Sequence, residues 1–544
     1  MIIIIKKIIN KANHNSIGAA ALIVSFFGVL SRILGLVRDR ILAAHYGAGD
    51  TLDVYYAAFR LPDLLFELLV VGALGAALIP VFSSIITSSK DMQRAWRCAN
   101  GVLIILVITF GFLAVLGIIF APYLVHFIVP GFPEEKMMQT VDLSRIMFLS
   151  PIIFSASAVL GNVLVSLKKF VVYSGASLFY NIGIIIGVIF LTSIFGDIGL
   201  AMGVILGAFL HFLIYFIAIR SLGLKLTSSL SILKNNYDVL NVFKLMLPRM
   251  FTSASNQIPL LLMTIFSSTL AAGSIASFSL ASNIQASILG LVGIPFSLAA
   301  FPALTEAYSE MKYSHFSLII SKTFRRILYY TVPLSVILFI LREQAVRVFF
   351  GAGHFDLDDT ILTYNVLGIL CLSLFAQSII PLLARGFYAM HDTRTPLYAA
   401  LTSQLFNVAI IFFFIRDYEL SAIAIAFSVT AILNATMLFV LLSQKNRELK
   451  YFKIGDTLGK ILLASGFSAV TTHYSRNFIG SLFYLDRVWH VLLQLVIPAG
   501  IGLFFYILIT ALFKMDEFET IRKKIIIRIF GRPQVATEEQ NTTL

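Results

Sequence analysis

The stretch of the chain that decides its fold class reads VLIILVITFGFLAVLGIIFAPYLV over residues 102–125. It carries no charged residue, and a helix needs about 20 apolar residues to cross the hydrocarbon core of a bilayer. Comparable runs recur along the 544 residues, of which 58% are hydrophobic and 13% charged. A soluble fold could not bury this much apolar surface. The sequence therefore predicts an all-α polytopic membrane protein.

Apolar runs bounded by charged or turn residues predict about fourteen transmembrane helices. They begin near Ile17, Leu52, Val102, Val141, Phe170, Ile198, Val239, Gly273, Leu318, Thr360, Pro396, Leu420, Ile454 and Arg487. Two runs, 52–86 and 273–308, are longer than the bilayer core and should tilt or extend beyond it. Most of the 41 basic residues fall in segments on the side of the N-terminus, so the positive-inside rule places both termini in the cytoplasm.

A weak internal repeat predicts the domain organisation. Lys168 and Asn181 match Arg394 and Asn407 at one common offset of 226 residues. This offset spans six helices, so the two halves should have the same orientation, as in transporters built from parallel repeats. The predicted parts are a cytoplasmic segment at 1–16, an N-lobe at 17–235, a C-lobe at 236–450, two further helices at 451–515 and a basic cytoplasmic tail at 516–544.

Ionisable residues inside spans are costly, so each is a candidate functional residue. They concentrate in the first two spans, where the chain reads SRILGLVRDR at 31–40 and FRLPDLLFE at 59–67. Arg32 and Asp39 are seven residues apart and share one helical face. Arg60, Asp63 and Glu67 are spaced i, i+3 and i+7 and share another.

The arginines indicate an anionic cargo. A guanidinium group stays protonated and presents a fork of donors that matches phosphate. We therefore expect Arg32, Arg38, Arg60 and Arg249 to line a cationic cavity, with the acids Asp39, Asp53, Asp63 and Glu67 in cavity or gating positions. The alternative is that these arginines only pair with the acids and hold two helices together.

Other classes of function find little support. The basic residues lie in short loops and at the C-terminus, not in a domain that could bind nucleic acid. Cys98, Cys371 and the scattered histidines do not have the spacing of a metal site, so no cofactor is expected. An intramembrane enzyme would need acids for Mg²⁺ at one membrane face. The only candidate cluster, Asp356, Asp358 and Asp359, falls in a short outer turn.

The motifs of the first two spans resemble those of the MurJ (MviN) family of lipid II flippases, in the multidrug/oligosaccharidyl-lipid/polysaccharide exporter superfamily. The similar segments read SRILGLVRD at 31–39, YGAG at 46–49, AAFRLPDLL at 57–65 and RGFYAMHDTRTP at 385–396. The resemblance covers roughly residues 20–515, and the first and last of these motifs are specific when found together.

The resemblance implies a transporter rather than an enzyme, active in peptidoglycan synthesis, cell-wall biogenesis and cell shape. It implies that lipid II, the undecaprenyl-diphosphate-linked precursor, moves from the inner to the outer leaflet of the bacterial cytoplasmic membrane by alternating access. Two six-helix lobes would carry the head group, and the last two helices would frame a groove for the lipid tail. Coupling to the membrane potential or to a monovalent ion, membrane lipids and cell-wall enzymes as partners, and a monomeric state are expected with it.

This chain departs from the family pattern at several charged positions. Where family members carry a basic pair followed by an acid, it has Phe66, Glu67 and Val71. Where they carry an Asp-Arg pair, it has Ser282 and Asn283. Export of another lipid-linked oligosaccharide or a drug, and a scaffold without transport activity, are therefore alternative functions.

Overall fold

The computed structural model describes residues 17–67, 74–223, 236–254, 257–446, 454–482, 488–520 and 522. Within these ranges the regular structure is helical and contains no strand, which confirms the predicted all-α class. Its first helices are α2 (Ile17–Tyr46), α3 (Asp50–Phe66), α4 (Leu74–Ser89), α5 (Met92–Ile128), α6 (Glu134–Met147), α7 (Ser150–Ser166), α8 (Phe170–Ile186), the π-helical turn η2 (Gly187–Leu191), α9 (Thr192–Phe195) and α10 (Ile198–Ser221). They are followed by α11 (Tyr237–Ala254), α12 (Ile258–Ser267), α13 (Ser274–Leu291), α14 (Gly293–Ser309), α15 (Tyr313–Ile340), α16 (Arg342–Phe350), α17 (Leu357–Cys371), α18 (Leu374–Ala389), α19 (Arg394–Lys445), α20 (Ile454–Leu482) and α21 (Val488–Leu512).

Most helices begin within a few residues of the predicted starts, except those predicted at Val102 and Val141, which begin at Met92 and Glu134. The overlong run at 273–308 is divided between α13 and α14, whereas the run at 52–86 contains α3 and α4, with residues 68–73 between them outside the described ranges. The spans predicted at Pro396 and Leu420 form the single helix α19, which is interrupted by Glu419 at φ 45°.

Eight helices in the described ranges are long and apolar enough to cross a membrane. The pair α17 and α18, bent by 47°, would make a ninth. The count of fourteen stays a prediction.

The chain divides into two compact units. The first comprises residues 1–287, 346–370 and 393–434, and the second comprises 288–345, 371–392 and 435–544. Helices α2 to α12 therefore belong to the same unit as most of α13 and α17. The predicted lobe boundaries at 235 and 450 are not tested by this division.

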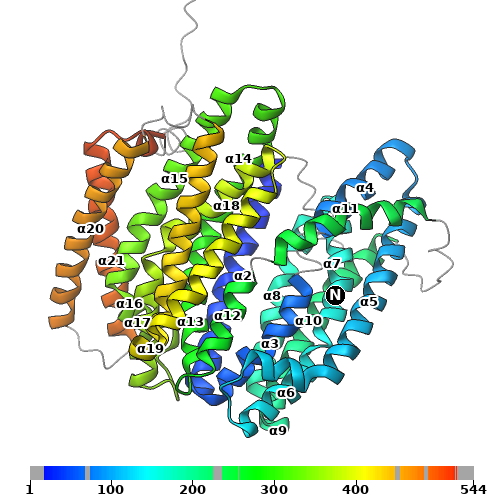
Figure 1. Cartoon of the computed structure of the whole chain (residues 1–544), viewed down its shortest axis with the longest axis horizontal. Helices are drawn as coiled ribbons and strands as arrows, with labels where there is room; N and C mark the ends of the chain where they lie inside the picture. Colours follow the sequence, from blue (N-terminus) through cyan, green and yellow to red (C-terminus); the bar gives the residue numbers. More distant parts are fainter. Residues whose placement is uncertain are drawn as a thin grey trace, which may run out of the picture. The chain divides into compact units, whose positions relative to one another are not determined.

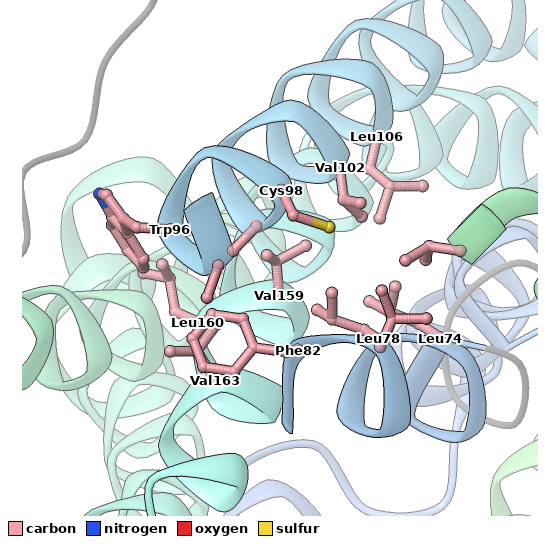
Figure 2. Close-up of a cluster of buried hydrophobic side chains, with 14 of the residues drawn as sticks. Leu74, Leu78, Phe82, Trp96, Cys98, Val102, Leu106, Val159, Leu160 and Val163 are labelled. Atoms are coloured by element: carbon pink, nitrogen blue, oxygen red, sulfur yellow. The ribbon is translucent and has the colours of Figure 1, made fainter. Parts of the chain in front are cut away.

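A core of apolar side chains between α4, α5 and α7 supports the first unit. Figure 2 shows side chains from these three helices pointing towards one another, among them Phe82, Val102 and Leu160, which are all fully buried. Inside a bilayer such a core is stabilised by close packing, because lipid tails are as apolar as the side chains themselves.

Helices α8 and α10 approach each other closely in the first unit because glycines face glycines. A Cβ atom on Gly183 would lie 2.2 Å from Cα of Gly207, and one on Gly187, in the turn η2 that continues α8, would lie 2.4 Å from Cα of Gly203. Small residues at such positions let two backbones come together. The close pair holds α8 in place beside α2, where its polar residues contribute to the site described below.

The second unit is built from α14, α15, α18, α20 and α21. Helices α20 and α21 run side by side as an antiparallel pair (Figure 1), and α20 also packs on α15. The hydroxyl of Tyr506 on α21 donates a hydrogen bond of 2.7 Å to the carbonyl of Tyr329 on α15. This pair corresponds to the two further helices predicted at 451–515.

Candidate functional site

A cavity of about 440 Å³ lies within the first unit. Side chains from α2, α3, α7, α8, α10, α12 and α13 line it, and its described charged residues are Arg38, Arg60, Asp63 and Glu67. Two arginines and two carboxylates leave this described lining balanced, so it lacks the excess of positive charge that the sequence predicts. The side chain of Arg249 and the whole of Val71 lie outside the described residues.

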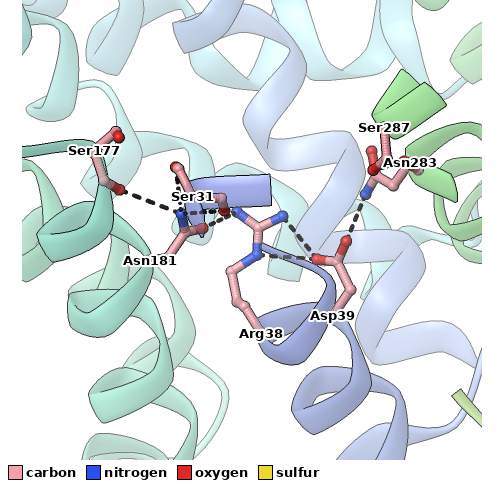
Figure 3. A network of polar contacts seen from close by, with 7 residues as sticks. All are labelled: Ser31, Arg38, Asp39, Ser177, Asn181, Asn283 and Ser287. Atoms are coloured by element: carbon pink, nitrogen blue, oxygen red, sulfur yellow. Dashed lines mark hydrogen bonds and ion pairs between the residues drawn. The ribbon is translucent and has the colours of Figure 1, made fainter. Parts of the chain in front are cut away.

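Arg38 forms the centre of a polar network between α2, α8 and α13 (Figure 3). Its Nε and Nη2 atoms donate to Oδ1 of Asp39 at 2.9 and 2.7 Å. Its Nη1 atom donates to Oδ1 of Asn181 at 3.2 Å. Asn181 in turn donates from Nδ2 to the carbonyls of Ser31 and Ser177 at 3.4 and 3.3 Å. The guanidinium is thus oriented by α8 as well as by its own helix.

Asp39 connects this network to α13. Its carboxylate is 1% exposed, and its Oδ2 atom accepts a hydrogen bond of 2.9 Å from Nδ2 of Asn283. A buried carboxylate is costly unless it is paired and hydrogen-bonded, and both oxygens of Asp39 have partners here. Asp39 therefore compensates Arg38 and joins two helices that are far apart in the sequence.

Arg60, on α3, has a different environment from Arg38. Its Nε atom donates to Oγ1 of Thr264 at 2.8 Å, and its Nη2 atom donates to Oγ of Ser279 at 3.3 Å. Among the described residues, neither Asp63 nor Glu67 forms an ion pair with it, although both line the same cavity. The carboxylate of Glu67 instead accepts a hydrogen bond from Nε2 of Gln257. The Arg60 guanidinium is therefore hydrogen-bonded by neutral hydroxyls, and the nearby Asp63 offsets its charge only in part, without a direct ion pair.

Three described site residues are not among the cavity-lining residues: Asp39, whose contacts are given above, Arg32 and Asp53. Arg32 donates from Nη1 to the carbonyl of Ala286 on α13 at 2.9 Å. Asp53 is 2% exposed and accepts hydrogen bonds of 2.8 Å from the backbone NH groups of Gly273 and Ala276, at the start of α13. A carboxylate at a helix N-terminus satisfies free NH groups and matches the helix dipole.

A lysine extends the Asp53 contact to α6. Nζ of Lys136 lies 3.0 Å from Oδ2 of Asp53 and 2.6 Å from Oδ1 of Asp50, and 4.1 Å above the centre of the Phe132 ring. On the other side of the turn between α2 and α3, the NH group of Ala48 donates to Oδ2 of Asp359 at 2.8 Å. This turn is thus fastened to α6, α13 and α17.

The comparison with protein families decides what kind of protein carries this cavity. The family model described as lipid II flippase MurJ matches residues 42–513. The chain belongs to the lipid II flippase MurJ family. Membership confirms the prediction of a transporter, a multi-pass protein of the bacterial cytoplasmic membrane that handles a lipid-linked precursor.

Relatives from two bacteria match most of the chain. The probable lipid II flippase MurJ of Buchnera aphidicola subsp. Acyrthosiphon pisum (strain APS) is 30% identical over 426 residues, which cover 78% of this chain and 82% of the relative. That of Rickettsia prowazekii (strain Madrid E) is 28% identical over 499 residues, which cover 89% of this chain and 96% of the relative.

Solved structures show the same fold. A lipid II flippase MurJ in an inward closed conformation matches with a TM-score of 0.74 and 24% identity, covering 93% of this chain and 100% of that one. An inward-facing multidrug resistance MATE family transporter of the MOP superfamily matches with a TM-score of 0.62 and 16% identity, covering 78% and 96%. The chain therefore shares the fold of both transporters.

The positions at which this chain lacks an expected MurJ charge have defined environments. Asn283 holds Asp39, as described above, and Ser282 lines the cavity beside it. Phe66 also lines the cavity, with its ring centroid 5.1 Å from that of Phe154 on α7. At these positions the MurJ-like cavity contains an amide, a hydroxyl and an aromatic ring.

Sequence reasoning missed several residues that build the site. Asn181 was noted only for the repeat, and Thr264, Ser279 and His211 were not singled out. Uncharged polar residues are common inside apolar helices, so the sequence does not distinguish the few that face a cavity from the rest. The one available signal was the spacing of Ser177 and Asn181, which are four residues apart on one face of α8.

Proposed function

We propose that this chain moves lipid II from the inner to the outer leaflet of the cytoplasmic membrane, with the head group passing through the cavity of the first unit. The observation that carries this proposal is the state of Arg60, a guanidinium that faces the cavity and is bonded only to hydroxyls among the described residues. Such a group favours a phosphate-bearing ligand, because a diphosphate can replace weak neutral acceptors with charge-assisted hydrogen bonds.

Arg38 and Arg60 have different roles in this proposal. Asp39 already compensates the charge of Arg38 at 2.7 Å, so Arg38 shapes the cavity and contributes less net attraction. Arg60 is the main anchor for the diphosphate. The acids Asp63 and Glu67 keep the net charge of the cavity low, which favours release of the head group on the far side.

Alternating access would require the turn between α2 and α3 to separate from its partners. With both termini in the cytoplasm, this turn lies at the outer face of the membrane, where Asp53 and Asp359 fasten it to α13 and α17. We propose that these contacts close the outer side of the cavity and break when the head group leaves. Coupling to the membrane potential or to a monovalent ion would supply the direction, without a cofactor.

The test uses a bacterium depleted of its own lipid II flippase, in which this chain is expressed and lipid II in the outer leaflet is measured. The wild-type chain should restore transport, and Arg60→Ala should reduce it at least tenfold at equal membrane abundance. Arg145→Ala is the matched control, because Arg145 lies on α6 outside the cavity and pairs with Asp142. Full transport by Arg60→Ala would contradict the assigned anchor, and no transport by the well-inserted wild type would contradict the cargo.

A further inference from the structure

One wall of the cavity consists of aromatic rings that the polar network does not use. Phe154 on α7 is at its centre, with ring centroids 5.1 Å from Phe66, 5.1 Å from Tyr180 and 5.7 Å from His211. All four residues line the cavity and all four are half-buried, so each keeps part of its surface towards the cavity. Four different helices supply these rings, which we call the ring wall.

The ring wall is unsuited to phosphate. The face of an aromatic ring carries partial negative charge, which attracts C–H groups and cations and repels anions. The described lining gives an organic cation no net electrostatic attraction either, because Arg38 and Arg60 balance the carboxylates of Asp63 and Glu67. The ligand that fits is a neutral group with flat C–H surfaces.

Polar atoms of the lining narrow the choice further. Within the described part of the chain, Tyr56 Oη, Ser282 Oγ and His211 Nδ1 are buried and have no hydrogen-bond partner. All three residues line the cavity. Buried polar atoms are rarely left unpaired, so a ligand with hydroxyl or amide groups at its edge is expected nearby. A pyranose ring combines C–H faces with a polar edge.

We propose that the ring wall binds the apolar face of the sugar attached to the diphosphate of the cargo. The inference rests on the proposed function, since it takes Arg60 as the anchor of the diphosphate. Phe66 follows Arg60 by six residues on α3, or about 9 Å along the helix. A diphosphate and its adjoining sugar can therefore reach both.

The experiment compares two lipids that differ only in the sugar-containing part. Purified full-length protein in lipid nanodiscs is titrated with lipid II and with undecaprenyl diphosphate, which has the same tail and diphosphate but no sugar. Phe154→Leu keeps an apolar side chain and removes the flat ring. It should weaken lipid II binding about 3- to 10-fold and leave the affinity for undecaprenyl diphosphate unchanged.

Two further variants make the result decisive. Phe66→Leu should have the same selective effect and serves as a second variant if Phe154→Leu does not fold. Phe212→Leu is the control, because Phe212 follows His211 on α10 but packs against the apolar core instead of lining the cavity. It should bind both lipids like the wild type.

The outcomes separate this inference from the function on which it rests. If Phe154→Leu weakens the binding of both lipids equally, or of neither, the proposal that the ring wall binds the sugar is wrong. Wild-type protein that binds both lipids with the same affinity would overturn it as well, while leaving Arg60 as the diphosphate anchor. Wild-type protein that binds neither lipid would contradict the proposed function itself.

Discussion

Asp39 and Asn283 show how single residues define this cavity. Both carboxylate oxygens of the buried Asp39 are hydrogen-bonded, one by the Arg38 guanidinium and the other by the Asn283 amide. An arginine at position 283, as the family resemblance implies, would bring a second positive charge to the same carboxylate. This chain instead has a neutral donor there, so the net attraction of the cavity for anions relies more on Arg60.

Asn283→Leu should destabilise the folded protein. The substitution leaves one oxygen of a buried carboxylate without a donor, which costs about 1–3 kcal/mol. Thermal unfolding in detergent should therefore show a lower midpoint. Ser287→Ala is the control one turn away, since Ser287 Oγ donates only to the carbonyl of Asn283 at 2.9 Å. An unchanged midpoint for Asn283→Leu would mean that the contact with Asp39 contributes nothing.

The sequence largely predicted which charged residues line the cavity, but it did not predict their hydrogen-bond and ion-pair partners. An arginine or aspartate in an apolar run is conspicuous, and Arg38, Arg60, Asp63 and Glu67 indeed line the cavity. Arg32 and Asp53 do not line the cavity, and their contacts with α13 could not be predicted from the sequence. Which polar group meets which charge depends on helices more than 200 residues apart.

Helices α8 and α10 illustrate how whole elements position the site. Glycines at their contact let the backbones touch, and α8 then presents Tyr180 and Asn181 towards the cavity and Arg38. The sequence indicated both helices, since Phe170 and Ile198 are the predicted and observed starts. Their close contact was not predicted, because glycines in membrane helices are frequent and only the fold shows which ones meet.

Gly207→Ala should impair folding through this contact. An added Cβ atom would lie 2.5 Å from the carbonyl oxygen of Tyr180, so the two helices must move apart, at a cost of about 1–3 kcal/mol. The yield of monodisperse protein and its unfolding temperature should both fall. Gly111→Ala on α5 is a matched control with no atom within 4 Å of the new methyl group. Equal behaviour of the two variants would refute the close packing.

The N-terminus of α13 is the second element that controls the site. Asp53→Ala removes an acceptor from two backbone NH groups and one of the two carboxylate partners of Lys136, at a cost of about 1–2 kcal/mol. We expect the turn between α2 and α3 to open more often. A cysteine introduced at Ala48 should then react faster with a membrane-impermeant maleimide added from outside. If the labelling rate equals that of the Ala48→Cys protein with Asp53 intact, the Asp53 contacts do not hold the turn closed.

The whole molecule combines apolar helices with a polar interior. Composition alone predicted a membrane protein, because a chain with 58% hydrophobic residues has no soluble alternative. Its division into compact units describes packing and does not test the predicted lobe boundaries. Helices α11 and α12, predicted in the C-lobe, share a compact unit with α2 to α10. Sequence repeats report ancestry and orientation, whereas compactness reflects which helices pack together.

Orientation in the membrane is the prediction that belongs to this scale. Because basic residues concentrate on one side of the spans, both termini should be cytoplasmic. Single cysteines placed at residue 10 and residue 540 should be protected from an impermeant reagent in intact cells and labelled after permeabilisation. A cysteine at Gly196 should be labelled in intact cells. Labelling of either terminus before permeabilisation would contradict the predicted topology.

The central claim is that the head group of lipid II passes through the cavity of the first unit. Its most direct test is site-specific crosslinking in living cells, with a photoreactive residue in place of Ser282 in the cavity or of Val115, which is 55% exposed on α5. The account predicts that illumination joins lipid II to position 282, and that Arg60→Ala weakens this product. Capture of lipid II at position 115 but not at 282, or capture that is indifferent to Arg60, would contradict it.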